Sequence, residues 1–184
     1  EKIGVGHLGD SRAYLLRDGV LEQLTHDHTF VQTLIDEGRI TEEQARSHPH
    51  RNLILKALDG VRHEEPDLFE LAVQPGARLL LCSAGACGPL ADDRLAAVLG
   101  QGPPDFAAVE LVRAALDAGS TDNVTCVVAD VREEPAPDDL QPLLVGAAAD
   151  LPRRAPLAPG GSRSAASDDA DDSDTGELEP VPAS

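Results

Sequence analysis

The chain has 184 residues, 33 of them acidic and 15 Lys or Arg, which gives a formal net charge of -18. This charge disfavours nucleic-acid binding, because nucleic-acid phosphates would be repelled. No apolar run approaches the roughly 18 residues that a membrane span needs. Three cysteines without CxxC spacing indicate reduced thiols and a cytoplasmic protein.

The acidic residues are unevenly distributed along the chain. Residues 1–132 hold 21 acidic and 12 basic residues, whereas residues 133–184 hold 12 and 3. The second segment is rich in Pro, Ala, Ser and Asp, and such a composition buries too little apolar surface to offset the entropy of ordering. We therefore expect a folded domain over 1–132 and an acidic, disordered tail over 133–184. An apolar island at 140–145 is most simply random composition, with a transient partner contact as the alternative.

The first half of the domain is predicted to contain a hairpin and two short helices. In "RAYLLRDGVLEQLT", Asp18 and Gly19 supply the positive φ angles of a tight turn between two apolar-rich arms. "HTFVQTLIDEG" has apolar residues at helical spacing and then Gly38 as a stop. In "TEEQARSH", Thr41 and Gln44 occupy capping-box positions.

The second half is predicted to alternate between strands and helices. "LFELAV" and "ARLLLCS" read as two strands joined at "QPG", and "NVTCVVADV" reads as a closing buried strand. "DDRLAAVL" and "DFAAVELVRAALDAG" read as amphipathic helices, the second with Asp105 as its N-cap. This mixture predicts an α+β fold.

Three loops at strand ends contain candidate site residues. They are "GHLGDSRAY" with Asp10, the turn "CSAGACG", and "GSTDNVT" with Asp122. Carboxylates presented by glycine-containing turns suit Mg²⁺ and Mn²⁺, which prefer oxygen ligands. Taken singly, each loop is better explained as an ordinary turn, because Asp before Ser or Asn is a common turn former.

Taken in order, the loops resemble a known family. "VGHLGDSRAYLLRDGVLEQLTHDHTFVQTLIDEGRITEEQARSHPHRN", "LLLCSAGACGPL" and "GSTDNVTCVVADV" are similar to successive parts of the metal-dependent protein phosphatases of type 2C. The match is best with the bacterial serine/threonine phosphatases that counter Hanks-type kinases. The resemblance covers residues 1–131.

The resemblance implies a fold and a chemistry. The family fold is an α-β-β-α sandwich with a binuclear Mn²⁺ or Mg²⁺ centre at one edge and a third, weaker metal site. No side chain is the nucleophile in this family, since metal-bound water attacks the phosphoserine or phosphothreonine ester. The implied partners are phosphorylated proteins, substrates of Hanks-type kinases in a cytoplasmic signalling system.

The resemblance also implies roles for particular residues. Asp122 would be a ligand of the binuclear centre, and Asp10 would serve the weaker third site. Residues 28–58 would form a flap beside the active site, with Asn52 at its metal-facing end. Three further residues would lie near the metals: Ser83, Gly85 and Asn123.

Two departures from the family bear on activity. Ala84 stands where the family has the aspartate of its Ser-Asp-Gly motif, so one metal would lose a charged ligand. The N-terminal Asp-Gly-x-Gly-Gly motif is absent, and the chain begins at Glu1 rather than at Met. We therefore expect the C-terminal part of a catalytic domain, weakly active or inactive by itself. The alternatives are a pseudophosphatase that binds without catalysis and a regulatory segment acting through its acidic tail.

Other polar residues have simpler explanations. His26 and His28 could suggest a metal pair, but without a third histidine or a cysteine nearby an exposed polar loop is favoured. Arg12 is interpreted as a structural ion-pair partner near Asp10. Cys82 and Cys126 lie in apolar strands and are expected to be inert core thiols, whereas Cys87 is expected in a more exposed turn.

Overall fold

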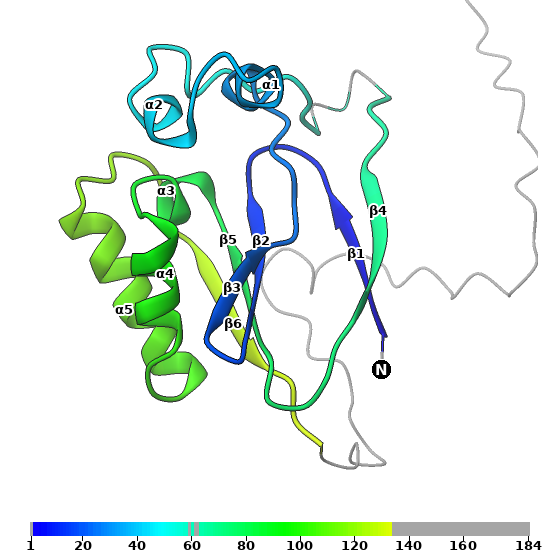
Figure 1. Cartoon of the computed structure of the whole chain (residues 1–184), viewed down its shortest axis with the longest axis vertical. Helices are drawn as coiled ribbons and strands as arrows, with labels where there is room; N and C mark the ends of the chain where they lie inside the picture. Colours follow the sequence, from blue (N-terminus) through cyan, green and yellow to red (C-terminus); the bar gives the residue numbers. More distant parts are fainter. Residues whose placement is uncertain (1, 59, 61–62, 134–184) are drawn as a thin grey trace, which may run out of the picture. The chain divides into compact units, whose positions relative to one another are not determined.

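The structure is a computed structural model that describes residues 2–58, 60 and 63–133. Apart from Glu133, the predicted tail over 133–184 lies outside the described residues. The elements follow one another in this order (Figure 1): β1 (Lys2–His7), β2 (Arg12–Arg17), β3 (Val20–Gln23), α1 (Phe30–Asp36), α2 (Glu42–Arg46), β4 (Asp67–Ala72), β5 (Arg78–Cys82), α3 (Ala84–Cys87), α4 (Asp92–Leu99), α5 (Pro104–Asp117) and β6 (Cys126–Asp130).

The described strands form two antiparallel sheets. One has two strands in the order β1-β4, and the other has four strands in the order β3-β2-β5-β6. The two strands predicted around "QPG" are present, and they belong to different sheets. β4 pairs with β1 and β5 pairs with β2 and β6, so the "QPG" connection leads from one sheet to the other.

The hairpin between β2 and β3 is confirmed. Asp18 has φ 52 and Gly19 has φ 77, the left-handed angles that a two-residue hairpin turn requires. The register pairs Arg17 with Val20 and Leu16 with Leu21. This turn therefore fixes which residues of the two strands face the core.

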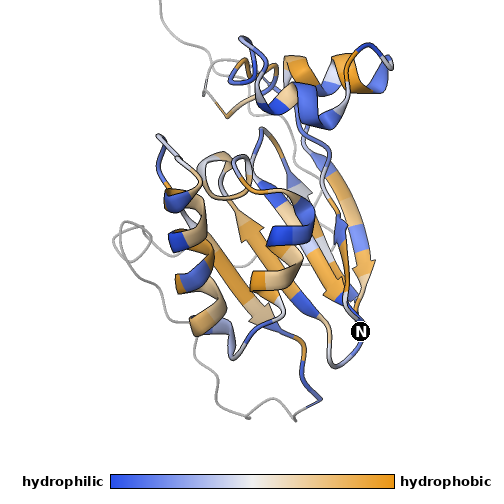
Figure 2. Ribbon diagram, turned by 60° about the vertical axis from the view of Figure 1, so that its left-hand side comes forward, coloured by the Kyte–Doolittle hydropathy of each residue, from blue (hydrophilic) through white to orange (hydrophobic). Residues whose placement is uncertain are grey.

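Helices α4 and α5 pack on one face of the four-stranded sheet (Figures 1 and 2). The core lies between these helices and the sheet. It includes Tyr14 and Leu80 from the strands and three leucines from the helices, Leu95, Leu99 and Leu111, and each of the five is at most 2% exposed. Polar residues lie on the outer surfaces of both helices (Figure 2). No described helix is both long enough and apolar enough to cross a membrane.

The opposite face of the four-stranded sheet is partly open. Leu81 on β5 and Val127 on β6 are exposed over 53% and 57% of their surface. Leu68 on β4, in the two-stranded sheet, is also exposed. Apolar strand residues at this level of exposure indicate a surface that is suited to further packing.

Of the two predicted helix N-caps, one is confirmed and the other is wrong. The capping box of Thr41 and Gln44 is confirmed, with both of its hydrogen bonds present. The prediction that Asp105 caps α5 is wrong, because the helix begins at Pro104 and Pro103 occupies the N-cap position without a side-chain bond. Proline suits the first helical position, since its missing N–H would have no partner there.

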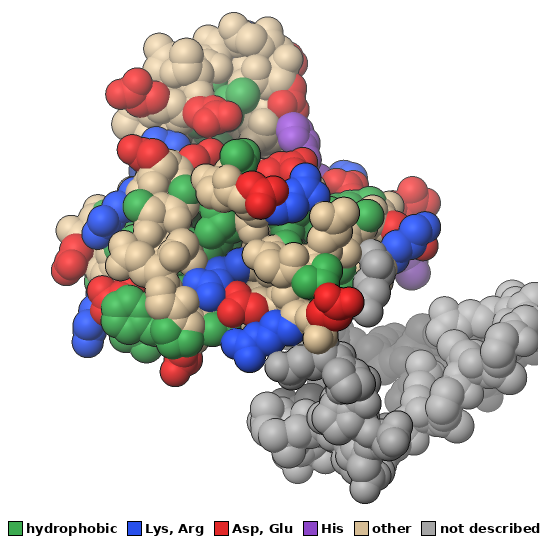
Figure 3. Space-filling model, turned by 60° about the horizontal axis from the view of Figure 1, so that its bottom comes forward, with side chains coloured by type: hydrophobic (Ala, Val, Ile, Leu, Met, Phe, Trp, Pro, Cys, Tyr) green, Lys and Arg blue, Asp and Glu red, His purple; other side chains and the backbone are tan. Residues whose placement is uncertain are grey.

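The end of the sheet where β5 begins and β6 ends is held by one arginine. The Arg78 Nε donates to Asp130 Oδ1 at 2.6 Å, and its other nitrogens donate to the carbonyls of Leu99 and Gly102. Acidic and basic side chains are interspersed over this end of the domain (Figure 3). These bonds tie the C-terminal end of α4 to the sheet, so this end has a structural role.

Candidate metal site

The predicted site residues lie in loops at the other end of the sheet. Asp10 is in the turn between β1 and β2, Ala84 is the first residue of α3, and Asp122 precedes β6. The helices of the flap, α1 and α2, lie beyond this same end (Figure 1). The fold therefore gathers at one sheet edge the three loops that the sequence singled out.

Ser83 joins two of these loops. Its hydroxyl donates to the carbonyl of Asn123 at 3.0 Å and accepts from the backbone N–H of Thr125 at 3.1 Å. Its backbone N–H donates to the carbonyl of Thr125. The turn after β5 and the loop that carries Asp122 are thereby fixed to each other.

Gly85 lies where these two loops touch. A β-carbon built on Gly85 would lie 2.5 Å from the Asn123 carbonyl oxygen and 3.1 Å from the Asp122 Cβ. Ser120 also donates from its hydroxyl to the Gly85 carbonyl at 2.7 Å. Only glycine allows the Asp122 loop to pack this closely on α3.

We predict that Gly85→Ala destabilises the fold by about 1–3 kcal/mol, because the added methyl group overpacks the contact with Asn123. Urea unfolding followed by circular dichroism measures this loss. Gly4→Ala is the matched control, since a β-carbon there meets nothing within 4 Å. Equal stability of the two variants would show that the Asp122 loop moves aside freely.

Asp10 sits in a negatively charged environment. Burial is the main cause that raises the pKa of Asp10, and the charges of Asp27 and Asp122 raise it further. The two predicted ligands, Asp10 and Asp122, are thus close enough for their charges to interact. Carboxylate oxygens are the ligands that Mg²⁺ and Mn²⁺ prefer, so Asp10 and Asp122 are ligand candidates by their chemistry.

We predict that Asp10→Asn stabilises the metal-free chain at neutral pH and weakens its binding of Mn²⁺. A folded-state pKa above the ordinary value of 3.8 means that ionised Asp10 costs stability at neutral pH. That cost disappears below pH 3.8, where Asp10 is protonated in both states. The effect is measured as the difference in thermal unfolding midpoint between Asp10→Asn and the wild type, in the presence of a chelator, at neutral pH and below pH 3.8. The control is Glu22→Gln, which changes an exposed carboxylate. A lower midpoint for Asp10→Asn at neutral pH would contradict the assignment.

The prediction that Arg12 has a structural role in an ion pair is confirmed. Its guanidinium forms a two-pronged pair with Asp27, with Nε–Oδ1 and Nη2–Oδ2 distances of 2.9 and 2.7 Å, and Nη1 donates to the Tyr14 hydroxyl. Burial opposes the charge of Arg12, but the bonds to Asp27 outweigh it and raise the pKa of Arg12. The ion-pair partner of Arg12 is therefore Asp27, and the charge of Arg12 also acts on Asp10, where it opposes the rise of the pKa.

Ala84 and Asn52 add no ligand to this edge. Ala84 is half-buried, and its methyl group offers no lone pair to a cation. Asn52 is exposed in a turn of the flap, and among the described contacts no hydrogen bond joins it to Asp10 or Asp122. Asp122 and Asn123 are both exposed, so the loop that carries them is open to solvent.

Comparison with known proteins shows how these loops relate to a family, although no family model matches the chain. The chain is 50% identical over 147 residues to the serine/threonine protein phosphatase PstP of Mycobacterium tuberculosis, covering 79% of this chain and 28% of the relative. It is 38% identical over 120 residues to a putative protein phosphatase 2C-type of Streptococcus pyogenes, covering 65% and 49%.

The solved structures agree with the sequence matches. The crystal structure of the Mycobacterium tuberculosis phosphatase PstP/Ppp superposes with a TM-score of 0.68 at 49% identity, covering 72% of this chain and 56% of that one. The chain belongs to the bacterial type 2C serine/threonine protein phosphatase family. The α+β fold matches this family over the same share of the chain.

The chain spans only part of the family members that it matches, from 28% to 49% of the two curated relatives. A structure of the PstP catalytic domain in complex with two manganese ions superposes with a TM-score of 0.66 at 47% identity, covering 72% of this chain and 54% of that chain. A phosphatase domain related to this chain thus binds manganese.

The expectation of an exposed Cys87 is wrong. The chain after β5 forms the short helix α3, which turns Cys87 into the core, where it is 1% exposed. Its thiol donates to the Ser83 carbonyl at 3.1 Å. The neighbouring Cys87 and burial raise the pKa of Cys82, and burial raises the pKa of Cys126. All three cysteines are free thiols.

Sequence reasoning missed a second group of potential ligands, which lies near the Asp10 loop. His7, His28 and Asp67 each place one ligand atom within 4.8 Å of the others. His28 was interpreted as part of an exposed polar loop, yet only 10% of its side chain is exposed. His26 is exposed as expected and pairs with Asp36 at 2.8 Å.

Proposed function

We propose that the protein containing this chain hydrolyses phosphoserine and phosphothreonine esters on proteins, using Mn²⁺ or Mg²⁺. The observation that carries the proposal is the grouping of Asp10 with Asp122 at one sheet edge, with the neighbouring cation Arg12 already committed to Asp27. Carboxylate oxygens are the ligands that a hard divalent cation prefers.

In this proposal, each residue of the chain has a limited task. Asp122 holds a metal ion of the binuclear centre and Asp10 serves the weaker third site, while Ser83 and Asn123 keep their two loops in register. A bound cation would act as a Lewis acid on the phosphoryl oxygens and lower the pKa of coordinated water. Ala84 supplies no ligand, so we expect weaker metal binding and lower activity than in family members with an aspartate at this position.

We further propose that the described domain is part of an α-β-β-α sandwich. The exposed face with Leu81 and Val127, on the side of the sheet away from α4 and α5, supports this arrangement. Strands from an N-terminal part of the domain would cover it and bring the further metal ligands of the family.

The proposed partners are phosphorylated substrates of Hanks-type kinases. The free thiols are consistent with a cytoplasmic location.

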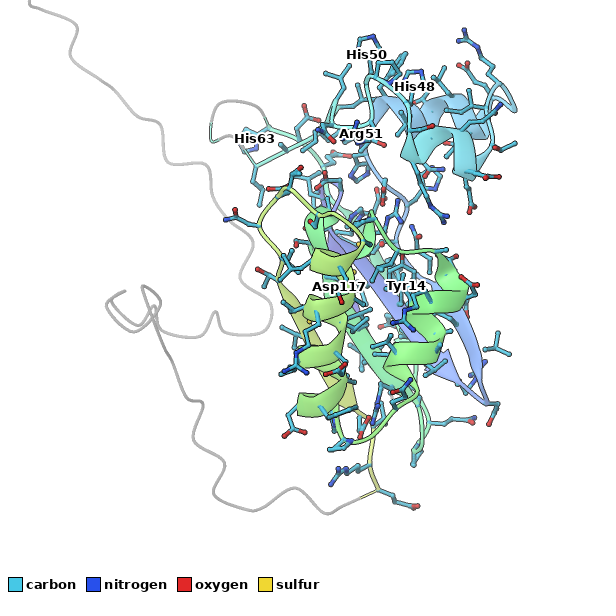
Figure 4. All side chains as sticks on the ribbon, turned by 90° about the vertical axis from the view of Figure 1, so that its left-hand side faces the viewer. Tyr14, His48, His50, Arg51, His63 and Asp117 are labelled. Carbon is cyan, nitrogen blue, oxygen red and sulfur yellow. The ribbon has the colours of Figure 1, made fainter. Side chains whose placement is uncertain are left out.

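The test is phosphate release from a phosphothreonine peptide by the full-length product of the gene, measured with and without Mn²⁺. Asp122→Asn should abolish the Mn²⁺-dependent rate, because it removes a charged ligand. Asp117→Asn is the control, since Asp117 is an exposed carboxylate at the end of α5 (Figure 4). An unchanged rate in Asp122→Asn would refute the assignment of this ligand.

A pseudophosphatase is the second candidate, and Ala84 is the observation that favours it. Such a protein would bind phosphorylated partners without hydrolysing them. It predicts that the wild-type protein releases no phosphate at any Mn²⁺ concentration but retains the phosphothreonine peptide in a binding assay. Hydrolysis by the wild-type protein would exclude this candidate.

A further inference from the structure

His7, at the end of β1, has an imidazole nitrogen without a partner. The residue is 6% exposed, and its Nε2 lies 2.8 Å from the carbonyl of Ser11. Because a carbonyl only accepts hydrogen bonds, Nε2 carries the proton and Nδ1 carries a lone pair. Nδ1 is buried and has no hydrogen-bond partner among the described residues. Buried nitrogens are normally paired, so this one calls for an explanation.

His28 lies directly against His7. The two rings stack with centroids 5.1 Å apart and planes 18° from parallel. The backbone N–H of Gly9 donates to Nδ1 of His28 at 3.1 Å. The proton of the neutral ring is therefore on Nε2, which lies 3.2 Å from Oδ2 of Asp67. Asp67 begins β4, and 45% of its side chain is exposed, so the group opens to solvent at its carboxylate.

We propose that His7, His28 and Asp67 form a zinc site, separate from the Asp10 and Asp122 site. Each of the three residues places one potential ligand atom within 4.8 Å of the others. We assign the ligands as the unpartnered Nδ1 of His7, Nε2 of His28 and a carboxylate oxygen of Asp67. Zinc–ligand bonds of about 2.0–2.1 Å in a tetrahedron place ligand atoms about 3.3 Å apart. To reach this geometry, the stacked rings of His7 and His28 must tilt so that both lone pairs point at one position.

The chemistry of the ligands selects the metal. Imidazole suits zinc and its neighbours in the transition series, whereas Mg²⁺ and Mn²⁺ prefer carboxylate, carbonyl and water oxygens. Three protein ligands leave a fourth position for water on the solvent side, next to the half-exposed carboxylate. The site would link β1, β4 and the segment that leads into α1.

Binding requires one proton to change place within His28. For Nε2 to bind zinc, the proton must move to Nδ1, and the hydrogen bond from Gly9 is then lost. The step balances within the ring, because the proton that leaves Nε2 is the one that Nδ1 gains. Zinc binding is therefore linked to the backbone of Gly9, which directly precedes Asp10. This inference does not depend on phosphatase activity.

The test is equilibrium dialysis of the 184-residue chain against Zn²⁺ in excess Mg²⁺, with bound zinc measured by elemental analysis. Dialysis counts metal per chain, so it applies whether the chain is a monomer or an oligomer. We expect one zinc per wild-type chain, and affinity lower in His7→Ala and Asp67→Asn by more than the roughly 10- to 100-fold that loss of an outer-shell partner causes.

Matched variants separate this site from other histidines. His26→Ala removes an exposed histidine two residues from His28, and His48→Ala removes one from the flap, where His48 and His50 lie far from Tyr14 (Figure 4). Both should bind zinc like the wild type. Asp67→Asn keeps an oxygen that can accept from His28, so it should fold normally and decide the matter if His7→Ala does not fold.

A second measurement reports the ligand change directly. The nitrogen-15 resonance of the Gly9 amide should shift on addition of Zn²⁺ in the wild type and in His26→Ala, but not in Asp67→Asn. Absence of zinc from the wild-type chain would overturn the proposal. The proposal would also be overturned if His7→Ala and Asp67→Asn both bound zinc as tightly as the wild type. It would be overturned as well if His26→Ala lost as much zinc as those variants. Either result would indicate adventitious surface binding.

Discussion

Replacing Asp27 with asparagine is expected to lower the free energy of unfolding by about 3 kcal/mol, because it leaves a largely buried guanidinium without its counter-charge. Asp27 is 8% exposed and the Arg12 side chain 26%, and both oxygens of the carboxylate are bonded to the guanidinium. An amide cannot balance the charge, and one of its two polar groups would face the guanidinium as a donor. Urea unfolding of the metal-free chain measures the loss.

Two comparisons make this expectation specific. Glu70→Gln breaks the exposed pair with Lys2, in which both side chains are about two-thirds exposed or more, and should change stability by less than about 1 kcal/mol. Replacing both partners, Arg12→Met with Asp27→Leu, should cost less than Asp27→Asn alone, since no unpaired charge remains. A double variant less stable than Asp27→Asn would mean that the pair stabilises the fold in its own right.

Local elements were predictable because their signals are local. The turn at Asp18 and Gly19 needs left-handed backbone angles that these residue types tolerate, and the capping box needs only the spacing of Thr41 and Gln44. The start of α5 was missed by two residues, because an Asp is a common N-cap and a proline suits the first helical position. The structure uses the proline.

Sheet membership could not be predicted in the same way. Apolar alternation marks β4 and β5 as strands, but it does not name their partners. β4 pairs with β1, more than sixty residues earlier, so Lys2 lies opposite Ala72 and His7 opposite Asp67. The sequence shows that "QPG" joins two strands, but not that the two strands belong to different sheets. The open face at Leu81 and Val127 was likewise invisible before the sheets were placed.

The two candidate metal sites differ in how much the sequence could reveal. Asp10 and Asp122 were found because their loops resemble family motifs in the family's order. Their roles as ligands remain predictions, although the structure brings their charges together. His7, His28 and Asp67 form no motif, and only the pairing of β1 with β4 places His7 beside Asp67. The unpaired nitrogen of His7 depends on hydrogen-bond geometry that no spacing encodes.

Replacing Ala84 with aspartate should raise both Mn²⁺ affinity and phosphatase rate in the full-length product of the gene. A carboxylate at this position would lie at the start of α3, next to Gly85, which packs against the Asp122 loop. Gain of a direct ligand should raise affinity by more than the roughly 10- to 100-fold that outer-shell partners contribute. Ala84 is half-buried at the first helical position, so the fold should accept the side chain.

Stability provides a second readout of Ala84→Asp. Without metal, the added charge repels Asp10 and Asp122, so the variant should unfold at a lower temperature than the wild type. With Mn²⁺ the order should reverse, because binding to the folded state stabilises it in proportion to affinity. Ala97→Asp, on the exposed side of α4, adds the same charge without a ligand and should show neither effect.

Calorimetric Mn²⁺ titration and initial rates on p-nitrophenyl phosphate complete the comparison. If the wild type already hydrolyses phosphate as fast as Ala84→Asp, position 84 is not a ligand position. If neither protein hydrolyses it, the pseudophosphatase candidate is favoured.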